Sequence, residues 1–314
     1  MNQLNIIIPD RLIGQRLDSA LAQMLPDYSR SKITNWVKSG KALINDKTFK
    51  PKEKVFGGEI VTLSIEAEQK NHWQAEDIAL DVVYEDDDII VINKPVGLVT
   101  HPGAGNWTGT LANALLFFDP NLANLDRAGI VHRLDKNTSG LMVVARSELA
   151  QKNLVEQLQT HSVSREYSAI VYGHMISGAT VDAPIGRDPK DRIKQAVNEN
   201  GKDAITHYRV IDRFAHHTHV KCILETGRTH QIRVHMASIG YPLIADTMYG
   251  GKVRFPKKAD DKLKAALKGF KRQALHAKKL TLIHPISGEL MTFKVPLPQD
   301  MQELLAVLSA YDSE

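Results

Sequence analysis

The sequence of 314 residues predicts an α+β fold whose main domain contains a mixed, largely antiparallel sheet. Several short apolar runs follow one another without an intervening helix, which is typical of antiparallel strands and unlike a doubly wound parallel sheet. A polar stretch without periodicity separates this region from a smaller basic region near the amino end. We therefore predict a small domain over residues 1–66, a linker over 67–79 and a larger domain over 80–314.

The small domain is predicted to contain two helices followed by two short strands. Apolar residues at helical spacing indicate the first helix, namely Leu17, Leu21, Met24 and Leu25. Pro26 closes this helix, a second helix begins at about Ser31, and Gly40 is a suitable stop for it. Residues 42–45 and 59–65 then have the character of strands.

The large domain alternates apolar strands with a few helices. The expected strands are 89–92, 130–131, 141–145, 169–172, 219–224 and 280–283. The expected helices are 110–116, 149–158, 229–237 and 299–310. This order favours a sheet in which sequential strands pair directly.

One stretch of the large domain places charged residues between two apolar runs. Residues 129–144 read Gly-Ile-Val-His-Arg-Leu-Asp-Lys-Asn-Thr-Ser-Gly-Leu-Met-Val-Val. Side chains two apart on extended backbone share a face, so Arg133 and Asp135 are expected to point into one cleft, away from His132 and Leu134. A guanidinium beside Asp135 would keep this carboxylate ionised, as a nucleophile or base requires. For an isolated pair, a surface ion pair that closes a turn is the alternative.

Four ordered motifs, which span residues 80 to 300, resemble those of the pseudouridine synthases of the large-subunit ribosomal RNA class. The matching segments are Ile92-Asn93-Lys94-Pro95 with His101-Pro102, His132-Arg133-Leu134-Asp135 with Thr138-Ser139-Gly140, Arg165-Glu166-Tyr167, and Gly227-Arg228-Thr229-His230-Gln231-Ile232-Arg233. The resemblance implies an isomerase that detaches uracil from ribose within RNA, turns it and rejoins it through carbon. No metal or organic cofactor is implied.

The resemblance also implies roles for residues in these motifs. Asp135 would begin glycosidic cleavage by attacking the sugar, adding to the base or removing a sugar proton, and these alternatives stay open. Tyr167 would lie over the uracil and help to remove the C5 proton, while Arg233 would pair with Asp135 and hold it ionised. Arg133 would take the place of the uridine that is flipped out of the RNA stack. Further substrate contacts are implied at His132, Arg228 and Ile232.

Positive charge is concentrated in two segments, although the whole chain carries a net charge of only +4. Residues 30–54 hold eight Lys or Arg against two acids, and residues 252–279 hold eleven against two. Such segregation is typical of proteins that bind polyanions, although either segment taken singly is more often a solvated face. Residues 14–66 resemble the S4 RNA-binding domain, which implies RNA contacts from its second helix through Arg30, Lys32 and Lys38.

Composition and chain pattern argue against several other classes of protein. The single cysteine, Cys222, excludes an intramolecular disulfide and suits a reducing compartment. We see no signal sequence and no apolar run of membrane-spanning length, and therefore expect a cytoplasmic protein, which we take to be a monomer. His216, His217 and His219 cluster without a Cys, Asp or Glu that would complete a zinc site, so we expect no metal.

Within the family, the stretches outside the motifs are most similar to the D-type bacterial enzymes. These stretches include Pro26-Asp27-Tyr28-Ser29-Arg30-Ser31, Pro51-Lys52-Glu53-Lys54-Val55 and His284-Pro285-Ile286-Ser287-Gly288. The likeness implies that the partner is 23S ribosomal RNA or a large-subunit precursor particle, and that the substrates are several uridines in the hairpin loop of helix 69.

Three alternatives remain open at this point. The chain resembles the C-type synthases too, which also carry an S4 domain and modify other uridines. A noncatalytic ribosome-assembly factor that binds RNA would retain the same fold. An RNA glycosidase that releases uracil would need a second carboxylate, for which Glu225 is the nearest candidate.

Overall fold

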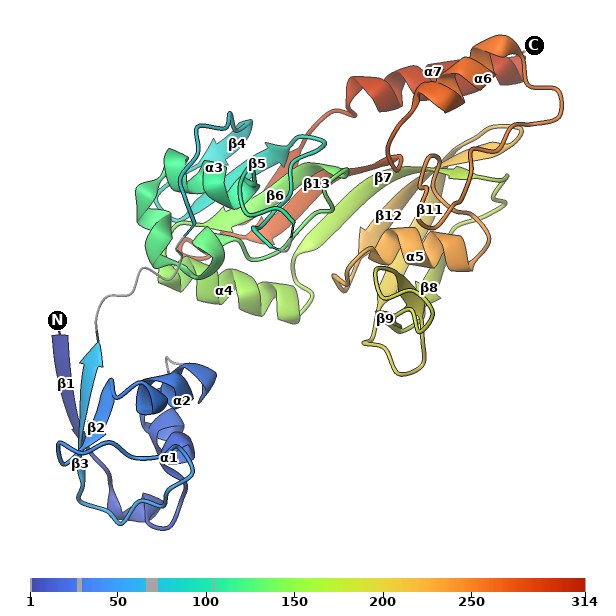
Figure 1. Ribbon diagram of the computed structural model, residues 1–314. Helices are drawn as coiled ribbons and strands as arrows, with labels where there is room; N and C mark the ends of the chain where they lie inside the picture. The colour runs from blue at the N-terminus through green and yellow to red at the C-terminus, as the bar shows by residue number, and fades with distance from the viewer. Residues whose placement is uncertain (1, 27–29, 66–72, 104, 314) are drawn as a thin grey trace. The chain divides into compact units, whose positions relative to one another are not determined.

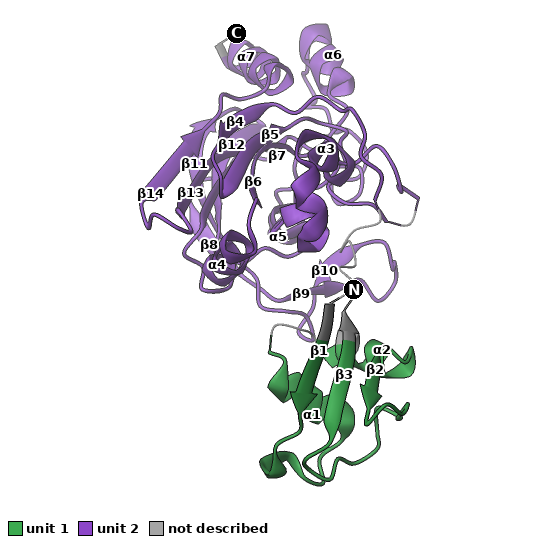
Figure 2. Cartoon of the chain, turned by 90° about the vertical axis from the view of Figure 1, so that its left-hand side faces the viewer, with its two compact units in different colours: residues 1–69 green, residues 70–314 purple. Residues whose placement is uncertain are grey.

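The computed structural model describes residues 2–26, 30–65, 73–103 and 105–313. The chain divides into two compact units, Met1–Gln69 and Lys70–Glu314 (Figure 2). The predicted α+β class is confirmed, with a small three-stranded sheet in the first unit and a large mixed sheet in the second. None of the helices in these described ranges has the length and apolar character needed to cross a bilayer.

The first unit packs two helices against a three-stranded antiparallel sheet of order β1-β3-β2. Its elements are β1 (Asn2–Ile7), α1 (Leu17–Met24), α2 (Arg30–Lys38), β2 (Ala42–Ile44) and β3 (Ile60–Ile65). The helix spacing seen in the sequence has a physical cause, because Leu17, Leu21 and Ile33 are buried against Val61 and Leu63 of β3. β1 was not predicted.

The second unit is built on a nine-stranded sheet of order β4-β5-β6-β13-β7-β12-β11-β8, with β14 paired to β13. The strands are β4 (Val82–Glu85), β5 (Ile89–Lys94), β6 (Ser139–Ala145), β7 (Ser164–Tyr172), β8 (Ala179–Asp182), β11 (Ile205–Arg213), β12 (His217–Leu224), β13 (Leu275–Ile283) and β14 (Leu290–Lys294). A separate hairpin is formed by β9 (Ile185–Arg187) and β10 (Gln195–Val197). Within the described ranges, β6 and β13 form the one parallel pair of the large sheet.

Helices cover both faces of this sheet (Figure 1). They are α3 (Leu111–Phe118), α4 (Glu148–Gln159), α5 (Gln231–Ser238), α6 (Asp261–Gly269) and α7 (Gln299–Ser313). Alternate residues of one strand serve opposite faces, since Ile90 and Ile92 of β5 pack with α3 whereas Ile89 and Val91 pack with α4. α6 and α7 pack beside each other on the second face, against β7.

The single cysteine lies in the centre of the large sheet. β12 lies between β7 and β11, and the thiol of Cys222 is completely buried there. Burial raises the pKa of this thiol to about 12. The residue therefore behaves as a small apolar side chain of the core.

Some sequence predictions differ from the structure. Ile130 and Val131 do not form a strand, because Ile130 makes only an isolated bridge to Val144 and the strand begins at Ser139. The helix expected from Thr229 begins at Gln231. α6, β4, β8, β11, β14 and the β9–β10 hairpin were not predicted.

Part of the segment predicted as a linker packs on the second unit. The side chains of Trp73 and Ile78 contact its main apolar cluster. The carboxylate of Glu76 accepts a hydrogen bond from the backbone N–H of Gly109, and the Asn113 amide donates to the carbonyl oxygen of Gln74 at 2.7 Å. Residues 66–72 of the predicted boundary lie outside the described ranges.

Candidate active site

The loop that carries Asp135 leads directly into β6. The turn is closed by the Thr138 N–H, which donates to the carbonyl oxygen of Asp135 at 3.0 Å. The buried Thr100 hydroxyl donates to the carbonyl oxygen of Leu134 at 2.9 Å. These contacts fix the backbone on both sides of the carboxylate, which itself is partly exposed.

A buried lysine ties this loop to the one that precedes α3. Lys94 is completely buried, and its Nζ atom donates to the carbonyl oxygens of Pro95, Leu98 and Lys136 at 2.8, 2.9 and 3.2 Å. Burial lowers the pKa of Lys94 to about 8, and the negative charge of Asp135 opposes this shift. All three ammonium hydrogens are used on backbone oxygens, so Lys94 is a structural cross-link.

Arg233 on α5 holds the carboxylate of Asp135. Its Nη1 atom lies 2.9 Å from Oδ2 of Asp135, while Nε and Nη2 donate to the two oxygens of Asp246 at 2.7 and 2.9 Å. Arg233 and Asp246 are 6% and 2% exposed. Burial works against the charge on Arg233, but the bonds and charges of Asp246 and Asp135 outweigh it and raise the pKa of the guanidinium. The guanidinium therefore stays charged beside Asp135.

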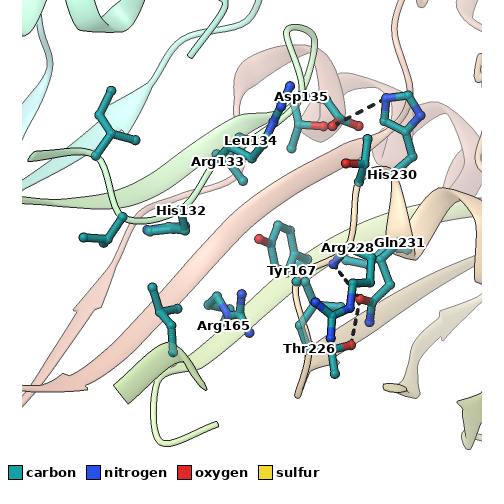
Figure 3. Close-up of a pocket in the computed structure, with 18 of the residues that line it drawn as sticks. His132, Arg133, Leu134, Asp135, Arg165, Tyr167, Thr226, Arg228, His230 and Gln231 are labelled. Atoms are coloured by element: carbon teal, nitrogen blue, oxygen red, sulfur yellow. Dashed lines mark hydrogen bonds and ion pairs between the residues drawn. The ribbon is translucent and has the colours of Figure 1, made fainter. Parts of the chain in front are cut away.

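Arg133 does not take the position expected beside Asp135. Its side chain is exposed, and no hydrogen bond or ion pair joins it to the described part of the chain. Arg233 occupies the Oδ2 side of the carboxylate instead. Arg133 lines the cavity together with Asp135 (Figure 3) and has no such partner among the described residues.

Tyr167 and Arg165 project from β7 toward the same cavity, since residues two apart on a strand share a face. Both side chains are buried, and burial raises the pKa of Tyr167 and lowers the pKa of Arg165. Arg165 Nη2 donates to the carbonyl oxygen of Glu225 at 3.0 Å, whereas its Nε has no partner among the described residues. Figure 3 shows Tyr167 between Arg165 and the Asp135 loop.

The other predicted substrate contacts also line this cavity, but two of them have structural bonds. Nε2 of His132 accepts the backbone N–H of Val143 at 3.1 Å, and burial lowers the pKa of the imidazole, so His132 is neutral. Arg228 Nε donates to the carbonyl oxygen of Asp203 at 2.9 Å. Ile232 is buried in the apolar cluster beneath the cavity.

The cavity has a volume of about 510 Å³, which is in the range of small-molecule sites. The described residues that line it include five arginines, Arg127, Arg133, Arg165, Arg228 and Arg233, but only one carboxylate, that of Asp135. Glu225 is not among them, and its side chain bonds to His207. An excess of cations around one carboxylate favours an anionic ligand such as a nucleic-acid strand.

Sequence reasoning missed three groups at this site. Asp246 has no motif around it, and only the fold brings it to Arg233. Arg165 and His230 lie inside quoted motifs but were given no role. His230 lines the cavity with its Nε2 atom 3.8 Å from Oδ1 of Asp135.

The described residues offer a different metal-ligating group from the one considered in the sequence. It consists of Asp86, Asp88 and His284 and does not include the histidines at 216–219. Oδ2 of Asp86 accepts from the Tyr84 hydroxyl at 2.7 Å and from His284 Nε2 at 3.0 Å, and Asp88 accepts from Ser147. Hydrogen bonds thus account for these side chains as a cap of the β4–β5 turn.

In the first unit, the three predicted RNA contacts all lie on α2. Arg30 Nη2 is 3.2 Å from Oδ1 of Asp18, although the arginine side chain is 56% exposed. Lys38 is exposed in the last turn of the helix. The side chain of Lys32 lies outside the described part.

Comparison with known proteins shows two family matches in chain order. Residues 15–61 match the S4 domain, and residues 88–238 match the RNA pseudouridylate synthase family. The chain is 54% identical over 302 residues to the ribosomal large subunit pseudouridine synthase D of Xanthomonas campestris, covering 96% of this chain and 91% of that protein. It is 54% identical over 309 residues to the protein of that name from Escherichia coli K12, covering 98% and 95%.

A solved structure agrees with these matches. Human RNA pseudouridylate synthase domain containing 4 aligns with a TM-score of 0.55 and 26% identity, covering 73% of this chain and 92% of that one. The resemblance seen in the motifs is therefore confirmed by full-length relatives and by the fold. The chain belongs to the RNA pseudouridine synthase family, and an S4 domain precedes its synthase domain.

Proposed function

We propose that this enzyme converts uridine to pseudouridine in 23S ribosomal RNA, at several positions in the hairpin loop of helix 69. The names of its relatives support a large-subunit ribosomal substrate. The single observation that carries the chemistry is the carboxylate of Asp135, the one acidic group among the described residues of an arginine-lined cavity, held 2.9 Å from Arg233. The partner is the RNA itself or a large-subunit precursor particle, and the enzyme acts as a cytoplasmic monomer.

One carboxylate is enough for this isomerisation. Hydrolysis of a glycosidic bond usually uses two carboxylates, and Glu225 does not line the cavity. In the isomerisation the uracil leaves as a stabilised anion and returns through C5, so a single ionised Asp135 suffices to begin cleavage. Arg233 holds that carboxylate deprotonated and fixes its direction. No cofactor takes part in the reaction.

The uridine must leave the RNA stack to reach Asp135, which lines the cavity. Arg133, exposed and unpaired among the described residues, fills the gap that the flipped base leaves. Tyr167 lies over the uracil and assists removal of the C5 proton after reattachment. His132, Arg228 and Ile232 shape the surrounding wall. Arg30, Lys32 and Lys38 of the S4 domain bind RNA backbone elsewhere on the substrate.

The test uses full-length enzyme and unmodified 23S ribosomal RNA, free and in precursor particles. We expect an RNA product of unchanged mass with pseudouridine in the helix 69 loop. Asp135→Asn should abolish this conversion while RNA binding persists. Release of free uracil would instead indicate a glycosidase. Pseudouridine at other 23S positions alone would indicate the C-type target, and binding without conversion on every substrate would reject the catalytic proposal.

A further inference from the structure

We infer that His230 is a second positioning residue for Asp135, held by Tyr249 with its proton on Nε2 and aimed at the Oδ1 oxygen. The inference rests on the proposed role of Asp135 as the catalytic carboxylate. Arg233 contacts Oδ2 of this carboxylate, whereas Nε2 of His230 lies 3.8 Å from Oδ1. The two oxygens of Asp135 thus face different groups, His230 directly before α5 and Arg233 three positions later in its first turn.

The hydrogen bonds around Tyr249 favour one of the two neutral tautomers of His230. The Tyr249 oxygen accepts the backbone N–H of Gln195 at 3.0 Å and lies 2.7 Å from Nδ1 of His230. The phenol therefore has its own hydrogen available for Nδ1, which can accept it with a lone pair. A neutral imidazole with an accepting Nδ1 carries its proton on Nε2, the atom that faces Asp135.

Tyr249 aligns both partners of the carboxylate. Its ring lies beneath the Arg233 guanidinium, with Cζ 5.0 Å from the ring centroid, and its hydroxyl holds His230. The two rings meet edge to face at 5.6 Å, which fixes the plane of the imidazole. His230 itself has φ of 58°, a left-handed conformation directly before α5 that turns the side chain into the cavity.

The charges around His230 are consistent with a neutral donor. Burial lowers the pKa of His230 most, Asp135 opposes this shift, and Arg233 and Arg133 add to it, while Asp246 opposes it. The net direction is down, so the imidazole is uncharged at neutral pH. Protonation of Nδ1 would also require the Tyr249 hydroxyl to turn its hydrogen away and accept a second bond.

The distance of 3.8 Å exceeds that of a hydrogen bond, so the contact with Oδ1 is electrostatic in the free enzyme. Catalytic hydrogen bonds often shorten only when substrate is bound. An RNA strand that closes the cavity removes water from this contact and strengthens it. With both oxygens held, the carboxylate cannot rotate away from the flipped nucleoside.

The first test measures the tautomer and needs no activity. Long-range ¹H–¹⁵N NMR spectra of full-length enzyme at pH 7.5, with the His230 signal assigned by its loss in His230→Asn, are expected to show a proton on Nε2. Tyr249→Phe keeps the ring but removes the hydroxyl, and should shift the proton toward Nδ1 and raise the pKa of His230. A proton on Nδ1 in the wild type, or no change in Tyr249→Phe, would overturn the inference.

The second test compares two substitutions of His230. In His230→Gln the amide nitrogen lies near the position of Nε2, whereas in His230→Asn it lies near the position of Nδ1. Only His230→Gln therefore retains a donor toward Asp135. We expect His230→Asn to lower kcat about 10-fold to 100-fold with KM unchanged, and His230→Gln to recover most of kcat. The left-handed backbone favours Asn over Gln, so a purely structural role predicts the opposite order. Equal activities, or a change in KM alone, would reject the positioning role.

Asp135→Asn separates this inference from the proposed function. If Asp135 acts on His230, loss of its negative charge should lower the pKa of His230 measured by NMR. An unchanged His230 titration would overturn the inference even if the variant is inactive. Activity of Asp135→Asn would instead refute the catalytic assignment of Asp135.

Discussion

Asp246 holds Arg233 through two hydrogen bonds, from Nε at 2.7 Å and from Nη2 at 2.9 Å. This bidentate contact leaves Nη1 as the atom that reaches Asp135. Because Asp246 is 2% exposed, the arginine has almost no freedom to swing away. The position of the proposed catalytic carboxylate thus depends on a second carboxylate that does not line the cavity.

The Asp246→Asn substitution should reduce both stability and kcat. It removes the charge that balances a buried guanidinium, and breaking such a pair costs about 3–5 kcal/mol. Urea unfolding measures the first effect and single-turnover conversion of RNA the second. Asp119→Asn is the matched control, because Asp119 binds Arg146 at 3.0 Å outside the cavity. If Asp119→Asn lowers kcat as much as Asp246→Asn does, the loss of stability alone would explain the lower kcat.

Gly140→Ala is expected to be strongly destabilising. Gly140 has φ of 115°, and a Cβ atom there would lie 2.2 Å from the carbonyl oxygen of Ala277, where β6 pairs with β13. The clash must move the start of β6 and with it the loop of Asp135, at a cost of about 3 kcal/mol or more. Gly109→Ala, with φ of 66° and no atom within 4 Å, should cost only about 1 kcal/mol. Thermal unfolding of both variants checks this, and equal costs would contradict it.

Buried neutral histidines should make the fold sensitive to acid. Burial lowers the pKa of His217 from 6.5 to about 4. Between these values the unfolded chain binds a proton that the native state does not, so the free energy of unfolding falls as pH falls from 6.5 to 4. His217→Phe keeps an aromatic ring beside Tyr172 and should flatten the slope by up to about 1.4 kcal/mol per pH unit. An unchanged slope in His217→Phe would contradict the assignment.

Lys38 should contribute to the salt dependence of RNA binding. It is exposed at the end of α2, and each phosphate contact releases counterions. Lys38→Gln should weaken binding and reduce the slope of log K against log salt by about 0.7 to 1. Arg11→Gln, an exposed cation outside α2, is the control and should leave the slope unchanged. Fluorescence anisotropy at several salt concentrations gives both slopes, and identical slopes for wild type and Lys38→Gln would remove this residue from the interface.

The sequence predicts the central strands and several helices well because their burial follows a simple period. Ile89 to Ile92 alternate between two covered faces, and Leu111 and Leu115 share one face of α3. The prediction at Ile130 failed for a physical reason. Arg127 and Ala128 adopt left-handed conformations that turn the chain, so Ile130 is apolar because it enters the core and not because it lies in a ladder.

The contacts of the site that could not be predicted from the sequence join residues that are far apart in the chain. Asp135 and Arg233 lie 98 positions apart, and only a family resemblance paired them. No periodic pattern or motif in the sequence predicts the hydrogen bonds from Arg233 to Asp246 or the hydrogen bond between Tyr249 and His230. Helix α6 was not predicted because its sequence is rich in charged residues, although Leu263 and Leu267 show helical spacing on its buried face.

The buried cysteine offers a probe of how the central sheet opens. A thiol-modifying reagent reacts with the thiolate and must reach it, and neither condition is met while Cys222 stays buried in the main apolar cluster. Modification therefore requires the packing around Cys222 to open. The rate of labelling then reports that opening at the β12 position that pairs with Tyr167, in an otherwise unaltered wild-type enzyme.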